Sequence, residues 1–106
     1  MAELEINFAG IKSPNPFWLA SAPPTNMGSM VERAFDAGWG GAVWKTLGEP
    51  IVNVASRLAS IDQGALRMIG LNNIELITDR LLEVNLREIY ECKKKYPNSA
   101  LVVSLM

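Results

Sequence analysis

The order of its apolar segments limits most strongly what this 106-residue chain can fold into. Short apolar runs at residues 17–20, 40–44 and 100–106 have the length and composition of strands buried in a parallel sheet. Residues 29–37 and 79–96, which lie between these runs, repeat apolar side chains at helical spacing. This alternation predicts an α/β fold with three parallel strands, either in an open doubly wound sheet or in the first part of a barrel.

A short β-hairpin is expected at the N-terminus, before the first parallel strand. Residues 4–8 alternate apolar and polar side chains, as half-exposed strands do. Ala9 and Gly10 have the composition of a turn, and residues 11–12 can form the return strand. Two prolines that follow the hairpin favour an extended entry into the first parallel strand.

Both expected helices carry signals at their ends. Ser29 and Glu32 have the spacing of a capping box at the start of the helix over 29–37, and Gly38 can end it. The second helix is expected to start at Asp79 or later and to end near residue 96. Four apolar residues are expected to form the face that packs on the sheet: Leu82, Leu86, Ile89 and Tyr90.

The segment from 47 to 73 is irregular in composition, with a small hairpin as a weaker expectation at residues 57–59 and 66–68. Connections of this length usually carry function. The last apolar run is not followed by a helix that could cover it. Because an uncovered strand favours aggregation, either partner chains cover it or the natural chain continues beyond Met106, and we expect continuation.

Composition argues against several classes of protein. Ten Lys and Arg residues against eleven Asp and Glu give a net charge of −1, without the basic excess of a nucleic-acid binder. No apolar run approaches the ~20 residues of a membrane span, and the acidic start lacks the layout of a signal peptide. A single cysteine and no histidine exclude an intramolecular disulfide, a multi-cysteine metal centre and histidine-based catalysis within this chain. We therefore expect a cytoplasmic protein that acts on small molecules.

Polar residues at the ends of the expected strands are the candidate site, because function in parallel α/β folds gathers at the carboxyl ends of strands. Small Ala20 and Ser21 would let a flat ligand approach the backbone, although they could also form a plain turn. Lys45 and Thr46 follow the second strand, and Lys45 is either a fixed cation in a cleft or a solvated side chain. Asn73 could bind a polar heterocycle or cap a helix.

Two other features are expected to be structural. The glycine-rich stretch 38–41 follows a helix and precedes a strand, which is the reverse of a phosphate-binding loop. Cys92 lies within the second helix without a base beside it, so we expect an inert thiol.

Three segments in order resemble the FMN domain of the NAD(P)-dependent dihydropyrimidine dehydrogenases. Residues 15–22 read NPFWLASA, residues 37–46 read AGWGGAVWKT, and residues 73–76 read NIEL. Residues 97–106 resemble the third barrel strand of that family. The related dihydroorotate dehydrogenases share the Asn-Pro-Phe start and the lysine at the end of the second strand. A dihydroorotate dehydrogenase-like enzyme is therefore one alternative, and a non-catalytic α/β module that dimerises through its open sheet edges is another.

The resemblance implies that residues 1–106 are the N-terminal part of a single FMN-binding (β/α)8 TIM barrel, cut at its third strand. Such enzymes reduce the 5,6 double bond of uracil or thymine, or run the reverse reaction. Their electrons come from NAD(P)H through FAD and iron–sulfur clusters elsewhere in the enzyme. The resemblance also implies an oligomer or an electron-transfer partner subunit, and no metal ligand within this chain.

Site residues follow from the same resemblance, position by position. Ala20, Ser21, Lys45 and Thr46 correspond to FMN-binding residues, and Lys45 and Asn73 to substrate-binding residues. The proton-donating cysteine of the family lies beyond the fourth barrel strand, so no catalytic residue is expected in this chain and Cys92 is not its counterpart. The sequence departs from the family at 54–57, where it reads VASR instead of VSPR. Alone, the chain is expected neither to hold FMN tightly nor to turn over.

Overall fold

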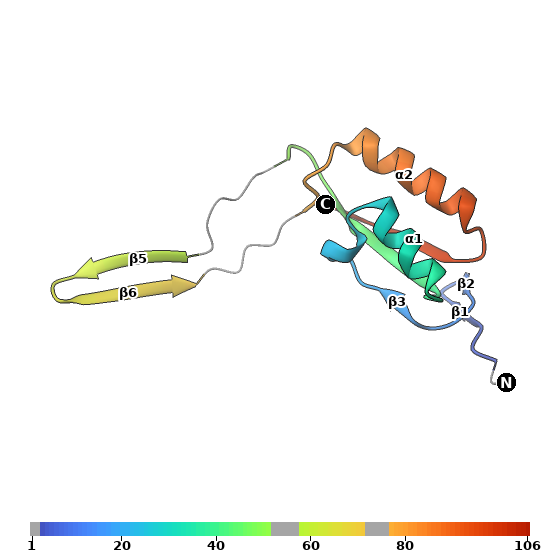
Figure 1. The fold of residues 1–106 in the computed structure, drawn as a ribbon, viewed down its shortest axis with the longest axis horizontal. Helices are drawn as coiled ribbons and strands as arrows, with labels where there is room; N and C mark the ends of the chain where they lie inside the picture. Colours follow the sequence, from blue (N-terminus) through green and yellow to red (C-terminus); the bar gives the residue numbers. More distant parts are fainter. Residues whose placement is uncertain (1–2, 52–57, 72–76) are drawn as a thin grey trace.

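The computed structural model describes residues 3–51, 58–71 and 77–106, and the predicted α/β class is confirmed (Figure 1). The predicted N-terminal hairpin and three parallel strands are present, with a second hairpin between them. The elements in chain order are β1 (Ile6–Phe8), β2 (Ile11–Ser13), β3 (Trp18–Leu19), the 3-10 helix η1 (Pro23–Thr25), α1 (Gly28–Asp36), β4 (Gly41–Leu47), β5 (Leu58–Gln63), β6 (Leu66–Leu71), α2 (Leu82–Lys95) and β7 (Ala100–Leu105).

The central sheet has the order β3–β4–β7, and both pairs of neighbours are parallel. Helices α1 and α2 lie side by side on one face of this sheet (Figure 1). Strand β7 was expected to be buried on both faces, but in the described part of the chain most of it is only half-buried. The described residues form three parallel strands rather than a closed barrel, so the barrel stays a prediction.

The core lies between the central sheet and the two helices. Trp44 of β4 is its largest side chain, and the other buried members are Val31, Phe35, Ala42, Leu47 and Cys92. Burial of these apolar surfaces supplies about 25 cal/mol for each Å² removed from water, which holds both helices on the sheet.

Two of the four residues predicted to form the packing face of α2 are exposed instead. Leu82 and Ile89 pack against the core, but the side chains of Leu86 and Tyr90 are 52% and 68% exposed. Asn85 and Cys92 are fully buried instead. The face that packs on the core therefore consists of residues spaced three and four apart: Leu82, Asn85, Ile89 and Cys92. A search for apolar spacing misses this face because Asn85 is polar.

The start of α1 also differs from its prediction. The helix begins at Gly28 rather than Ser29, and its N-cap, Met27, makes no side-chain cap hydrogen bond. The Gly28 N–H instead donates to Glu88 Oε2 of α2 at 2.8 Å. A tertiary contact thus replaces the predicted capping box. The other end was predicted correctly, since Gly38 with a φ of 97° follows the helix.

The β1–β2 hairpin lies at the amino ends of the parallel strands. Its turn residues, Ala9 and Gly10, both have positive φ, which is the geometry of a type I′ turn. Ser13 Oγ at its end donates to Gly40 O at 2.9 Å and accepts from Trp18 Nε1 at 2.9 Å. These bonds join the hairpin to the start of β3 and β4.

The β5–β6 hairpin extends away from the central sheet (Figure 1). It is longer than the strands expected at 57–59 and 66–68, and residue 57 lies outside the described residues. An ion pair between Asp62 and Arg67 lies next to its turn. Five of its large apolar side chains are exposed: Ile61, Leu66, Met68, Ile69 and Leu71.

Among the helices of the described segments, none combines the length and the apolar character needed to cross a bilayer.

Candidate functional site

The carboxyl ends of β3 and β4 bring two predicted site residues together. Ser21, two residues after β3, donates from its Oγ to Trp44 O at 3.0 Å and accepts from the Thr46 N–H at 3.1 Å. The hydroxyl oxygens of Ser21 and Thr46 are 3.3 Å apart. The predicted meeting of these two strand ends is therefore present, while the ligands assigned to the residues stay predictions.

Lys45 lies between these contacts, inside β4 rather than beyond its end. The sequence indicated a strand that stops at residue 44, but β4 continues to Leu47. Its pairing with β7 shifts register between Trp44 and Leu47, so that Lys45 lies in a bulge. Bulges of this kind often re-aim a side chain beside a functional site. Lys45 is only 8% exposed, so the reading of a fully solvated lysine does not hold.

Ala20 and the segment after Ser21 form the open rim of the site. Ala20 is exposed, and its carbonyl accepts a hydrogen bond from Thr25 Oγ1 at 3.3 Å. Thr25 is fully buried in η1 and also bonds to Ala22 O at 3.0 Å. A buried hydroxyl thus fixes the chain where small side chains leave its backbone accessible.

Asn73, the remaining predicted residue, lies outside the described residues. The description resumes at 77, and there the Thr78 N–H donates to Thr46 O at 2.9 Å. Thr78 is 3% exposed. The chain that follows Asn73 therefore lies beside Thr46, at the carboxyl end of the sheet.

Ser104 is a neighbour of the site that sequence reasoning missed. Its Oγ lies 2.9 Å from Thr46 Oγ1, so hydroxyl groups link the ends of all three parallel strands. One signal could have revealed it, because Ser104 is the only polar residue in the apolar run 100–106. A lone hydroxyl near the carboxyl end of a buried strand merits the same attention as Ser21 and Thr46.

Asn85 of α2 supports this end of the sheet from the side that the helices cover. Its Oδ1 accepts from Trp44 Nε1 at 3.1 Å, and its Nδ2 donates to Thr78 Oγ1 at 3.2 Å. The same Nδ2 lies 3.2 Å from Arg80 O and 3.3 Å from Leu81 O. A fully buried amide with this many partners holds the strand before Lys45 and the segment after Asn73 in one arrangement.

Glu88 of α2 contacts both the entry of its own helix and the start of α1. Arg80 donates to both carboxylate oxygens of Glu88, at 2.5 and 2.6 Å. The hydrogen bond from Arg80 is the main cause that lowers the pKa of Glu88, and the Gly28 N–H lowers it further. Glu88 is therefore anionic at neutral pH, where it suits the positive end of the α1 dipole.

Cys92 is fully buried in α2. Burial, as the main cause, raises the pKa of the Cys92 thiol to about 11, which fits the inert cysteine predicted from the sequence. In residues 3–51, 58–71 and 77–106, no group of three or more acidic, cysteine or histidine side chains is arranged to hold a metal ion.

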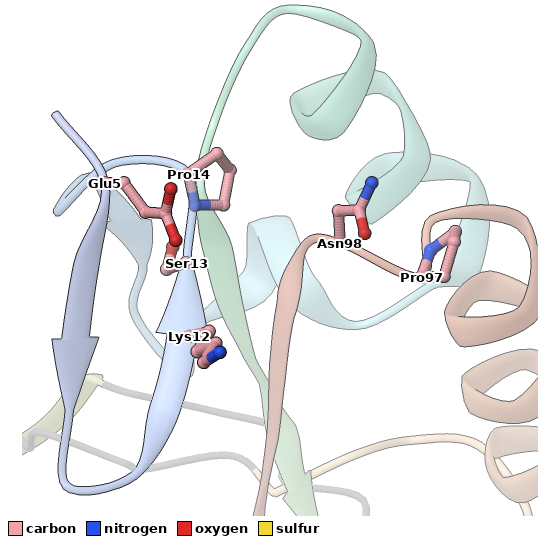
Figure 2. Close-up of a pocket in the computed structure, with 6 residues that line it drawn as sticks. All are labelled: Glu5, Lys12, Ser13, Pro14, Pro97 and Asn98. Atoms are coloured by element: carbon pink, nitrogen blue, oxygen red, sulfur yellow. The ribbon is translucent and has the colours of Figure 1, made fainter. Parts of the chain in front are cut away.

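A hollow of about 480 Å³ lies at the other end of the sheet (Figure 2). Its lining comes from the β1–β2 hairpin and from the turn between α2 and β7: Glu5, Lys12, Ser13, Pro14, Pro97 and Asn98. Of the predicted site residues that the structure describes, none lines it. Because it lies at the amino ends of the strands, it is separate from the carboxyl-end site.

Comparison with known proteins places the chain beside one group of enzymes. No protein-family model matches it. It is 39% identical over 112 residues to the chloroplastic dihydropyrimidine dehydrogenase (NADP(+)) of Arabidopsis thaliana. It is 41% identical over 105 residues to the NAD-dependent dihydropyrimidine dehydrogenase subunit PreA of Escherichia coli strain K12. Both alignments cover 98% of this chain, which spans about a quarter (26%) of the length of each relative.

Proposed function

We propose that this chain is the N-terminal part of the FMN-binding (β/α)8 domain of a cytoplasmic dihydropyrimidine dehydrogenase. Such an enzyme reduces the 5,6 double bond of uracil or thymine with electrons from NAD(P)H, or catalyses the reverse. The similarity to proteins of that name over 98% of the chain supports the proposal. The structural observation that carries it is the meeting of Ser21 and Thr46, with Lys45 between Thr46 and Trp44, at the carboxyl ends of neighbouring parallel strands.

The groups at these strand ends suit a flavin. Ala20 and Ser21 are small, so a planar ring could approach the backbone there. Thr46 adds a hydroxyl, and Lys45 adds a cation in a largely buried position. When bound, FMN would supply the two-electron chemistry, and the Lys45 ammonium would stabilise the negative charge of its reduced form. The backbone at Ala20 and Ser21 and the side chains of Lys45 and Thr46 are the proposed FMN contacts.

The pyrimidine is proposed to lie over the same strand ends, within reach of Lys45 and Asn73. A side-chain amide both donates and accepts hydrogen bonds, as the imide edge of uracil requires. The hydrogen bond from Thr78 to Thr46 supports this placement, because it brings the connection that includes Asn73 back to the strand end.

The rest of the proposed enzyme lies outside this chain. FAD, iron–sulfur clusters and the NAD(P) site are proposed to belong to other segments or to an electron-transfer partner subunit, within an oligomer. The proton donor to the pyrimidine is proposed to lie there too, because the thiol of Cys92 is buried and has a raised pKa.

Purification of the full-length protein that contains this chain tests the proposal. We expect a flavin absorption spectrum that is bleached anaerobically by dihydrouracil but not by dihydroorotate. Bleaching by dihydroorotate alone would favour a dihydroorotate dehydrogenase-like enzyme, and a colourless protein without bound FMN would overturn the proposal.

A further inference from the structure

We propose that Ser21 is a positioning residue, whose hydroxyl fixes the backbone of Lys45 and so aims the lysine at the flavin. This inference rests on the proposed function. It assigns Ser21 an action through Lys45, instead of the direct contact of its hydroxyl with FMN that the resemblance implies.

One oxygen atom bonds to both peptide groups that flank Lys45. The Ser21 hydroxyl donates to Trp44 O, which belongs to the peptide group before Lys45, at 3.0 Å. It accepts from the N–H of Thr46, which belongs to the peptide group after Lys45, at 3.1 Å. The two soft backbone dihedrals of Lys45 lie between these groups, so this bridge restrains both of them.

The bridge lies where the sheet itself offers no partner. Strand β3 ends at Leu19, and the register of β4 against β7 shifts between Trp44 and Leu47. Backbone groups in such a bulge leave the regular ladder, and unpaired groups are costly when buried. The Ser21 hydroxyl takes the place of the ladder bonds that β3, which ends at Leu19, does not supply to Trp44 O and the Thr46 N–H.

The hydrogen-bond capacity of Ser21 supports the same conclusion. A serine hydroxyl has one proton to donate. Trp44 O at 3.0 Å and Thr46 Oγ1 at 3.3 Å are both within reach of that proton, so partners inside the protein engage it. Thr46 O accepts a separate hydrogen bond from the Thr78 N–H at 2.9 Å. The next peptide group along β4 is therefore held as well.

The test compares variants of the full-length holoenzyme by anaerobic rapid mixing with dihydrouracil. We expect Ser21→Ala to slow flavin reduction at saturating substrate by about 10-fold, and Ser21→Thr, which keeps a hydroxyl, to restore most of the rate. In a Lys45→Ala background, Ser21→Ala should slow reduction by less than about 2-fold further, because residues that act as a unit are not additive. Ser29→Ala, which removes an exposed hydroxyl on α1, is the matched control and should react like the wild type.

Three outcomes would overturn the inference. Unchanged rates in Ser21→Ala would show that the bridge is dispensable. Equal losses with and without Lys45, or weaker FMN binding by Ser21→Ala in the Lys45→Ala background, would show that Ser21 acts independently of the lysine. If Ser21→Ala does not fold, Ser21→Cys replaces it, because a thiol fills the space and bonds weakly. Failure of the proposed function looks different, since the wild type itself would then lack FMN or fail to react with dihydrouracil.

Discussion

Single side chains complete the sheet where its backbone pairing stops. The Ser21 hydroxyl bonds to Trp44 O and to the Thr46 N–H at the bulge of β4. The Thr46 hydroxyl in turn contacts the hydroxyl of Ser104 in β7. Lys45, which lies between Trp44 and Thr46, is only 8% exposed. A lysine whose backbone is fixed in this way needs less reorganisation to present its ammonium to developing negative charge.

Replacing Lys45 with alanine should therefore slow flavin reduction in the full-length enzyme. We expect a loss of about 100-fold in the rate of bleaching by dihydrouracil, since removal of one preorganised stabilising group has effects of this size. Lys94→Ala, which removes an exposed lysine of α2, is the control and should keep the wild-type rate. A normal rate in Lys45→Ala would contradict the role assigned to the ammonium.

Cys92 should resist alkylation in the native protein. Its side chain is fully buried, and its pKa is raised to about 11, so very little thiolate is present below that pH. Mass spectrometry of iodoacetamide-treated protein at pH 8 should find residue 92 unmodified, and modified after denaturation. Rapid labelling of the folded protein at this residue would show that the helix face around it opens.

The sequence predicted these residues unevenly, for a physical reason. Ser21 and Thr46 stand at the ends of apolar runs, where a polar residue signals the edge of the sheet. Asn85 and Ser104 stand inside apolar patterns, so a method that reads apolar spacing treats them as interruptions. Their partners come from distant elements, and only the folded chain brings these together.

At the scale of whole elements, the entry of α2 and the start of α1 form one unit. Glu88 accepts hydrogen bonds from Arg80 and from the Gly28 N–H, which lies 60 residues earlier in the chain. The local sequence around residue 28 contains no sign of this partner. The kinds of elements and their order were therefore predictable, whereas the first residue of α1 was not.

Glu88→Gln should destabilise the full-length protein in a pH-dependent way. The folded-state pKa of Glu88 is lowered, chiefly by Arg80, so its contribution is present above the pKa of the unfolded state. It is lost as the pH falls through the lowered folded-state value. We expect a cost of about 1 kcal/mol at pH 7 for this partly exposed pair, shrinking below about pH 4.

Chemical denaturation at pH 7 and at pH 3 measures this difference. Glu91→Gln, at an exposed position of the same helix, serves as the control and should leave the stability close to that of the wild type at both pH values. A difference for Glu88→Gln that is the same at both pH values would show that the carboxylate charge does not contribute.

Across the whole molecule, the two ends of the central sheet differ in character. The amino end carries the β1–β2 hairpin and the hollow lined by Glu5, Lys12 and Asn98 (Figure 2). The carboxyl end carries the hydroxyl groups, Lys45 and the return of the chain at Thr78. The α/β class and the three parallel strands followed from sequence patterns, whereas the bulge in β4 depends on pairing with β7 and could not be read locally.

Hydrogen exchange of the full-length protein, with and without FMN, tests most directly that the cofactor binds at the carboxyl end of this sheet. The account predicts that added FMN slows amide exchange in peptides that span residues 19–22 and 44–47. Peptides that span residues 12–14 and 97–99, at the hollow of the amino end, should exchange as before. Protection at the amino end, with no change at residues 19–22 and 44–47, would contradict the account.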